Sequence, residues 1–236
     1  MLKKNHKVAI YLEGHFSTDY GKMGIGVLRY LSNHIVAVID SKNNGKNTNE
    51  FNSIKRSVPI VSTLDAAVSN GAEVLILGIA PSGGKIPEAW FKVIESAISK
   101  NLSIINGLHD TLLSKYKNSL RNNQWIWDVR VPQFVPKIAS GKAAKLKNKR
   151  ILCVGTDMAV GKMTTSLEMH KWAIEKKINS SFIATGQIGI TISGEGIPLD
   201  AYKVDHACGA VEQMILKNQN SDWIFIEGQG SLLNPG

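Results

Sequence analysis

The chain has 236 residues, two cysteines and a formal net charge of +9, from 28 basic and 19 acidic residues. This length suits one large domain or two modest ones, since domains cluster near roughly 100–150 residues. Two cysteines are too few for a disulfide framework or a metal cluster, and no apolar run approaches the roughly 20 residues of a membrane span. We therefore predict a cytoplasmic protein, without a membrane partner, whose positive charge favours anionic small molecules.

The first half of the chain predicts alternating strands and helices. Short apolar runs that end in Gly, Asp or Asn occupy residues 7–13, 34–40, 73–79 and 102–106. Such runs are typical of parallel strands buried on both faces. Helical spacing covers residues 24–33 and 87–100, with Pro87 in a plausible first turn. The alternation predicts a doubly wound, Rossmann-like α/β domain.

A domain boundary is expected where this pattern fades, in the proline-containing stretch WIWDVRVPQFVPK. A run of basic residues without an acid follows, formed by Lys137, Lys142, Lys145, Lys147, Lys149 and Arg150. No aromatic residue interleaves with these lysines, so stacking on single-stranded nucleic acid is not supported. We predict a Rossmann-like domain over residues 1–136, a basic, solvated linker over 137–148, and a second domain over 149–236.

The second domain repeats the strand–helix alternation. Strand patterns lie at ILCVG, SSFIATG and DWIFIEG, and helical patterns at KMTTSLEMHKWAIEKK and VDHACGAVEQMILK. The sequence stops directly after a strand and a glycine-rich turn, where a sheet of this class normally continues. We therefore expect a P-loop NTPase-like α/β domain that is incomplete at its C-terminal end.

The segment GTDMAVGK, residues 155–162, has the features of a phosphate-binding loop. An apolar strand delivers the chain to a turn whose backbone N–H groups converge on an anion, and the next helix adds its positive N-terminal end. Five residues separate the two glycines, one more than in the common P-loop. The predicted phosphate-binding residues are Gly155, Thr156, Asp157, Val160, Gly161, Lys162, Met163, Thr164 and Thr165.

Met163 stands where such loops usually carry a Ser or Thr that holds magnesium. A thioether is a poor magnesium ligand, since this ion prefers hard oxygen donors. Each residue along a helix is rotated by about 100° from the one before it, so Thr164 and Thr165 point away from the position of Met163 and neither replaces the missing hydroxyl. The sequence therefore favours phosphate binding, leaves nucleotide hydrolysis in doubt and predicts no metal site.

Two further segments are expected at the same carboxyl edge of the sheet, where open α/β sheets bind ligands. ATGQIGITISGEG follows a strand, and its glycines allow the backbone to approach a ligand. WIFIEGQGSL places Glu227 at the end of a strand, where P-loop proteins often keep a metal-binding or water-orienting acid.

The first domain offers weaker signals. Gly24 and Gly26 form G-x-G, but Arg29 occupies the third-glycine position, and only Asp40 supports a nicotinamide site. In GIAPSGGKIPEAW, two glycines and Lys85 precede a helix and form either a second anion nest or a plain turn.

GTDMAVGK resembles the loop of dethiobiotin synthetase, and EGQGSL resembles a segment of the same enzymes. The whole chain is more similar to a two-domain family long catalogued as a domain of unknown function, some of whose members are D-glutamate N-acetyltransferases. In that family a methionine after the loop lysine is usual, and members are typically longer. The matching segments are YLEGHF, GIGVLRY, AVIDS, GIAPSGGKIPEAW, NGLHD, WDVR, VGTDMAVGKMTTS, ATGQIGI and IEGQGSL.

The resemblance implies acetyl transfer from acetyl-CoA, a co-substrate, to the amine of D-glutamate. The loop would hold the phosphates of CoA, and the chemistry needs a base, an oxyanion donor and cations for the substrate carboxylates. Asp157, Glu227 and His206 are the candidate bases. Gln187 or nearby backbone amides such as that of Gly189 are candidates for the oxyanion, and Lys85 or Arg130 for a carboxylate.

Two other functions stay open at this point. An ATP-dependent ligase or kinase of the dethiobiotin synthetase type would bind magnesium-ATP, but Met163 weakens this alternative. A non-catalytic nucleotide-binding protein would use the basic run and show no turnover, with binding that weakens steeply with salt. The residues leave a homo-oligomer open.

Overall fold

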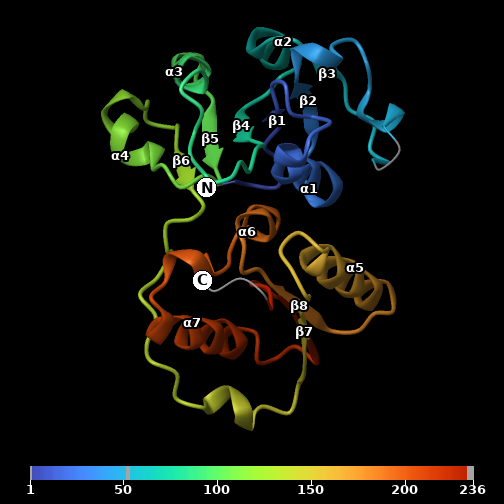
Figure 1. Ribbon diagram of the computed structural model, residues 1–236, viewed down its shortest axis with the longest axis vertical. Helices are drawn as coiled ribbons and strands as arrows, with labels where there is room; N and C mark the ends of the chain where they lie inside the picture. Colours follow the sequence, from blue (N-terminus) through green and yellow to red (C-terminus); the bar gives the residue numbers. More distant parts are fainter. Residues whose placement is uncertain (1, 52–53, 233–236) are drawn as a thin grey trace. The chain divides into compact units, whose positions relative to one another are not determined.

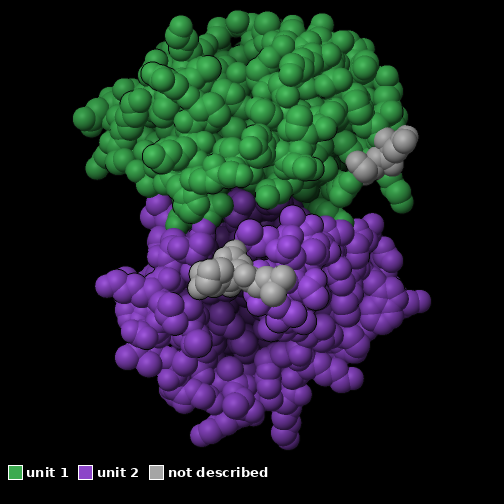
Figure 2. Space-filling view, in the orientation of Figure 1, with its two compact units in different colours: residues 1–130 green, residues 131–236 purple. Residues whose placement is uncertain are grey.

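The computed structural model describes residues 2–51 and 54–232, and the chain divides into two compact units, Met1–Arg130 and Val131–Gly236. Each unit contains its own parallel sheet (Figure 1). Figure 2 shows the two units in different colours. In the described residues, no helix combines the length and the apolar character that crossing a membrane requires.

The first unit is built on a sheet of six parallel strands in the order β3-β2-β1-β4-β5-β6. The chain reverses its direction of winding between β1 and β4, which is the switch point of a doubly wound sheet. The strands are β1 (Val8–Tyr11), β2 (Ile35–Ile39), β3 (Ile60–Val61), β4 (Val74–Leu77), β5 (Ser103–Asn106) and β6 (Ile126–Asp128). Most are runs of buried Val, Ile and Leu, as the parallel arrangement requires.

Helices and 3₁₀ turns connect these strands. They are η1 (Asp19–Gly21), α1 (Lys22–Tyr30), η2 (Ser41–Asn43), η3 (Thr48–Glu50), α2 (Leu64–Ser69), α3 (Trp90–Ser99), α4 (Leu112–Tyr116) and η4 (Lys117–Ser119). Helix α1 lies very close to the sheet, because the Gly24 amide donates to the carbonyl of Gly78 at 2.7 Å. A Cβ at Gly24 would come within 2.7 Å of a methyl carbon of Leu12. Gly24 is therefore needed for helix–sheet contact.

Asp40, the one residue that favoured a nicotinamide site, is fully buried at the end of β2. Its carboxylate accepts hydrogen bonds from the amides of Gly14 (3.0 Å) and Lys42 (3.3 Å) and from the side chain of Asn43 (2.8 Å). These bonds tie the turn after β1 to the turn after β2. Asp40 is thus used by the chain itself, and the nicotinamide alternative gains no support.

In its described residues, the second unit has a three-stranded parallel sheet in the order β7-β9-β8, with further elements around or between the strands. The strands are β7 (Lys149–Cys153), β8 (Ser180–Ile183) and β9 (Trp223–Glu227). The others are η5 (Lys142–Lys145), the phosphate loop, α5 (Lys162–Glu175), α6 (Gln187–Ser193), η6 (Leu199–Ala201), α7 (Val204–Lys217) and the turn after β9. Its core cluster joins Ile183, Ile197, Ala210, Met214, Ile215, Ile224 and Ile226.

Strand β7 is an edge strand within the described residues, and much of it faces solvent. Leu152 is 55 % exposed and Val154, just after the strand, is 77 % exposed. Trp172 and Ile174 on α5 are also exposed. A parallel strand is normally covered on both faces, so the apolar exposure of β7 is unusual.

The basic run was interpreted as a linker, and the structure shows how it is attached within the second unit. The carboxylate of Glu212, on α7, accepts hydrogen bonds from the amide and hydroxyl of Ser140 (2.5 and 3.0 Å) and from the amide of Ala143 (3.2 Å). Lys142 and Lys145 remain exposed. The predicted limits at residues 136 and 148 stay predictions.

Two elements are not predicted by the sequence patterns. The strand pattern fades at WIWDVR, yet β6 forms there and pairs with β5. No helix is predicted for ATGQIGITISGEG, whose glycines indicate a close approach of the backbone to a ligand, yet this segment contains α6. Gly189 lies inside this helix because its lack of a side chain makes room for a buried neighbour, described below.

Candidate functional site

The phosphate loop connects β7 to α5 and depends on two glycines. Gly161 precedes the helix with φ of 99°, in the left-handed region that glycine adopts without strain. A Cβ at Gly155 would lie 2.5 Å from a methyl carbon of Val160, so only glycine lets the loop fold back on itself. Backbone N–H groups at such a strand–loop–helix junction form a site for an anion.

Lys162 begins α5, and its side chain turns back into the loop. The residue is 9 % exposed, and its Nζ donates to the carbonyl oxygens of Asp157 (2.6 Å) and Gly230 (2.9 Å). The Leu232 amide donates to the carbonyl of Thr156 at 3.1 Å. The ammonium group therefore lies where the loop meets the turn after β9.

The other predicted loop residues differ in their exposure. Asp157 is exposed, and its side chain accepts a hydrogen bond from the Met158 amide at 2.6 Å. Met163, Thr164 and Thr165 form the first turn of α5, and the Thr165 amide donates to the carbonyl of Gly161 at 2.8 Å. The arrangement can hold a phosphate, whereas the metal-binding hydroxyl of common P-loops is replaced by Met163.

Glu227 ends the central strand β9 and is 5 % exposed. Its Oε2 accepts hydrogen bonds from the amides of Thr185 (3.0 Å) and Gly186 (3.2 Å), and its Oε1 accepts one from Gln229 at 3.3 Å. Burial raises the pKa of Glu227 to about 7, although these hydrogen bonds and the positive charge of Lys162 act to lower it. A carboxyl group with such a pKa can take up or release a proton near neutral pH.

Two glycines allow the segment after β8 to lie against this carboxyl group. A Cβ at Gly189 would come within 2.3 Å of the Glu227 Oε2, and one at Gly186 within 3.1 Å of its Oε1. Gln187 begins α6 between them and is half-buried. The structure thus brings Gly189 and the start of α6 to Glu227, and Lys162 is near enough to act on its charge.

Sequence reasoning missed two residues that hold Glu227. Thr185 donates its amide to the carboxylate and its hydroxyl to the Glu227 carbonyl oxygen at 2.7 Å. Gln229 reaches both Glu227 and the Thr185 hydroxyl, the latter at 3.2 Å. The only sequence signal for either was its position: Thr185 lies two residues after the end of β8, and Gln229 lies in EGQGSL.

Three predicted residues are not joined to this group. His206 is half-buried in the first turn of α7, and in the described part of the chain no hydrogen bond or ion pair connects it with Glu227 or Lys162. Lys85 and Arg130 belong to the first unit, where Lys85 is exposed and the Arg130 Nε donates to the carbonyl of Gly107 at 2.7 Å. Burial lowers the pKa of Arg130. The substrate roles of these residues stay predictions.

The fold and the loop define a two-domain α/β protein in which a Rossmann-like domain precedes a P-loop domain. Residues 41–132 match a family model described as a domain of unknown function, the Rossmann-like N-terminal domain of DUF1611. Residues 137–236 match the P-loop, C-terminal domain of the same family. Both the α/β fold class and the two-domain resemblance are confirmed.

A solved structure agrees with this assignment. The crystal structure of a DUF1611 family protein from Anabaena variabilis ATCC 29413 is 45% identical and superposes with a TM-score of 0.93, covering 98% of this chain and 68% of that one. The chain belongs to the DUF1611 family.

Two curated relatives carry a functional name, D-glutamate N-acetyltransferase. One, from a Pseudoalteromonas species, is 41% identical over 172 residues, which are 72% of this chain and 51% of the relative. The other, from Tritonibacter scottomollicae, is 37% identical over 216 residues, 90% of this chain and 62% of the relative. The chain therefore spans between about half and three fifths of the length of these relatives.

Proposed function

We propose that the chain carries the phosphate-binding and proton-accepting parts of an N-acetyltransferase that moves acetyl from acetyl-CoA to the amine of D-glutamate. The observation that carries the proposal is Glu227, a buried acid with a pKa of about 7 that lies within electrostatic range of the loop lysine. The names of the two curated relatives support acetyl transfer to D-glutamate, and acetyl-CoA as the donor is part of the proposal. They are names of longer proteins, so the activity is proposed for this chain.

The loop supports the binding of CoA through its phosphates. Lys162 and the backbone amides between Gly155 and Gly161 offer positive charge and N–H donors to a diphosphate. No phosphoryl bond breaks in acetyl transfer, so a magnesium-holding hydroxyl is not required. Met163 at that position is compatible with a ligand held by its phosphates and reacting elsewhere.

Glu227 supports the proton transfer. The amine of an amino acid is protonated near neutral pH and must lose a proton before its nitrogen can attack the thioester carbonyl carbon. Glu227 accepts that proton, a C–N bond forms and the C–S bond breaks. The CoA thiolate leaves and takes up the second proton, which the nitrogen loses as it becomes an amide. Asp157 is exposed and engaged with the Met158 amide, which suits a role in shaping the loop, and His206 is a third candidate base.

The remaining roles belong to groups around this centre. A developing oxyanion needs N–H donors, and Gln187 with the amides at the start of α6, near Gly189, are the candidates in the second unit. Lys85 and Arg130 are the candidates for a substrate carboxylate in the first unit.

The binding test compares acetyl-CoA with magnesium-ATP on the full chain by isothermal titration calorimetry. We expect acetyl-CoA to bind and Lys162→Ala to weaken it at least about tenfold, because a charge-assisted contact with phosphate is lost. Lys171→Ala, which removes an exposed lysine from the same helix, is the matched control and leaves the affinity unchanged. Tight, magnesium-dependent ATP binding without affinity for acetyl-CoA would contradict the proposal and favour a ligase or kinase.

The reaction test incubates the chain with acetyl-CoA and D-glutamate and measures N-acetyl-D-glutamate by mass spectrometry, with L-glutamate as the comparison. We expect an acetylated product that forms about 10²–10⁴-fold more slowly with Glu227→Gln. Binding of acetyl-CoA with no acetylated product from either glutamate would restrict the chain to nucleotide binding.

A further inference from the structure

A cavity lies in the second unit and shares no residue with the phosphate loop or with the residues that hold Glu227. Its volume is about 200 Å³. An apolar cavity of roughly 150 Å³ is large enough to bind benzene, so this one has room for a small metabolite. It is lined by Gln133, Phe134, Glu195, Gln213, Met214 and Lys217.

One side of this cavity is apolar. Met214 is 6 % exposed and belongs to the core cluster of the unit, and Phe134 packs against that cluster. The backbone at Phe134 is fixed, because the Tyr202 hydroxyl donates to its carbonyl oxygen at 2.9 Å. The apolar wall is therefore continuous with the core and keeps its shape.

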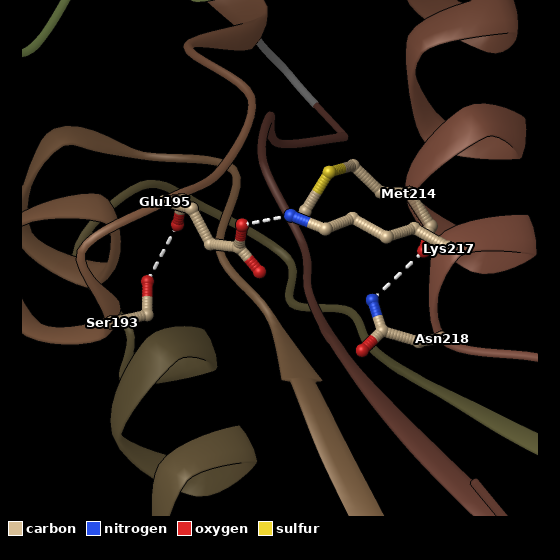
Figure 3. Close-up of polar contacts among 5 residues, drawn as sticks. All are labelled: Ser193, Glu195, Met214, Lys217 and Asn218. Carbon is tan, nitrogen blue, oxygen red and sulfur yellow. Dashed lines mark hydrogen bonds and ion pairs between the residues drawn. The ribbon is translucent and has the colours of Figure 1, made fainter. Parts of the chain in front are cut away.

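The other side carries one charge of each sign. Glu195 and Lys217 form an ion pair, and Figure 3 shows their side chains extending toward each other, with Met214 one helical turn before Lys217. Their side chains are 45% and 58% exposed, so both can be reached from solvent. A solvent-exposed ion pair contributes little to stability and is easily exchanged for other partners.

Hydrogen bonds hold the backbone next to Glu195 and next to Lys217 (Figure 3). The Ser193 hydroxyl donates to the carbonyl oxygens of Glu195 (2.6 Å) and Gly189 (2.8 Å). A Cβ at Gly196 would come within 2.6 Å of the Ala184 carbonyl oxygen, so glycine allows the turn that presents Glu195. On α7, the Asn218 side chain donates to the Met214 carbonyl at 2.9 Å and closes the helix end beside Lys217.

We propose that this cavity binds a free α-amino acid with an apolar side chain. The α-carboxylate pairs with Lys217, the α-ammonium pairs with Glu195, and the side chain lies against Phe134 and Met214. Glu195 and Lys217 each keep an opposite charge beside them when the ligand binds. The ion pair between them is replaced by two ion pairs with the ligand. The amides of Gln133 and Gln213 are available at the same walls for the polar head.

This geometry predicts a preference that a plain surface ion pair lacks. A ligand with only a carboxylate or only an ammonium group would separate Glu195 from Lys217 and leave one of them without a partner. A zwitterion satisfies both. The inference does not depend on acetyl transfer, because its ligand and its residues differ from those of the proposed function.

The test titrates L-leucine and D-leucine into the full chain by calorimetry, with 4-methylpentanoate and 3-methylbutylamine as ligands that carry one charge each. We expect at least one leucine enantiomer to bind in the millimolar range or tighter, and the single-charge ligands to bind about tenfold more weakly or not at all. Glu195→Gln and Lys217→Gln each weaken leucine binding about tenfold, because each removes one charge-assisted contact.

Two controls separate a binding role from a structural one. Asp65→Asn breaks the ion pair between Asp65 and Lys100 in the first unit, which is also partly exposed, and leaves leucine binding unchanged. The double variant Glu195→Lys with Lys217→Glu restores the two charges in exchanged positions and binds leucine more tightly than either single variant, since both ion pairs can re-form. Acetyl-CoA affinity is the same in all these variants.

The proposal is overturned if neither enantiomer of leucine binds with a dissociation constant in the millimolar range or below. It is also overturned if leucine binds equally well to the wild type, Glu195→Gln and Lys217→Gln. Equal affinity for leucine and the single-charge ligands would likewise show an apolar pocket with no recognition of the zwitterion.

Discussion

Burial disfavours the charged form of the Glu227 carboxyl group, and this lowers the free energy of unfolding of the chain when the group is ionised. Its pKa rises from an ordinary 4.5 to about 7 in the folded chain. Between these values the folded state keeps a proton that the unfolded chain releases, so stability falls as pH rises through this window. At about 1.4 kcal/mol per pKa unit, the loss is about 3 kcal/mol once the pH exceeds 7.

We therefore expect Glu227→Gln to raise the free energy of unfolding at pH 8 by roughly 1–3 kcal/mol and to change it little at pH 4, since an amide resembles the protonated acid. Urea unfolding followed by circular dichroism measures both values. Glu175→Gln, at an exposed position on α5, should show no such pH dependence. An equal effect of Glu227→Gln at both pH values would contradict the raised pKa.

The same pKa sets the expected pH dependence of acetyl transfer. The base must be charged to accept a proton, so the rate should rise with pH and level off above about 7. Removing a general base typically costs about 10²–10⁴-fold, which is the loss expected for Glu227→Gln. A rate profile that keeps its rise near pH 7 in Asp157→Asn but loses it in Glu227→Gln would distinguish the two candidates.

Helix α6 shows how far the sequence predicts the elements of the site. The apolar runs before Gly155, Gly186 and Gly228 correctly indicated β7, β8 and β9, because strands buried in a sheet carry a strong apolar signal. The helix α6 was not predicted in ATGQIGITISGEG, because its glycines usually disfavour helices. Gly189 is tolerated there because it faces the Glu227 carboxylate, a contact that exists only in three dimensions.

Gly189→Ala should disturb this contact. The added methyl group would lie within 2.3 Å of the Glu227 Oε2, so helix and carboxylate must move apart. We expect a loss of about 1–3 kcal/mol in unfolding free energy, typical of overpacking, and a tenfold or larger loss of acetyl transfer. Urea unfolding and the mass-spectrometric assay measure these effects.

Gly194→Ala is the matched control at the end of the same helix. Its Cβ would meet no atom within 4 Å, and its φ of 79° adds only backbone strain, about 1–2 kcal/mol. It should lose stability and keep its activity. If both variants lost activity equally, the contact between Gly189 and Glu227 would not be the cause.

Glu212 joins two elements, α7 and the basic segment that contains η5. The amides of Ser140 and Ala143 donate to its carboxylate and lower the pKa of Glu212. A lowered pKa stabilises the folded chain above the ordinary value and loses this effect as pH falls through the folded value. Glu212→Gln should therefore lower the melting temperature at pH 7 and much less in strong acid, whereas Glu175→Gln should have no effect at either pH.

At the scale of the whole chain, the sequence predicted two α/β parts but not the order of their strands. Hydrophobic runs in the sequence identify β1, β2, β4 and β5 individually. None of these runs indicates which strand lies next to it in the sheet. The order β3-β2-β1-β4-β5-β6 is set by pairing between strands that are distant in the sequence, and the short β3 and β6 were missed because two or three residues carry no clear pattern.

Hydrogen exchange followed by mass spectrometry should report the difference between the two sheets. We expect the amides of β1 and β4, in the middle of six strands, to exchange slowest, because they open only with the whole unit. The amides of β7 should exchange orders of magnitude faster, since the strand pairs with β9 alone among the described residues. Protection of β7 equal to that of β1 would mean that another strand covers its free side.

The free side of β7 also bears on how the protein behaves at high concentration. An exposed, apolar edge invites strands of other molecules and hence aggregation, and lysines at an edge are a common defence. Lys149 and Arg150 begin β7 with two positive charges, and the Lys149 ammonium is held 4.9 Å from the centre of the Trp223 ring. At roughly 1 M salt the Debye length falls to about 3 Å, so this repulsion is screened. Concentrated solutions of the wild-type chain should therefore scatter more light in high salt than in low salt. The double variant Lys149→Ser, Arg150→Ser should scatter more light than the wild type already in low salt.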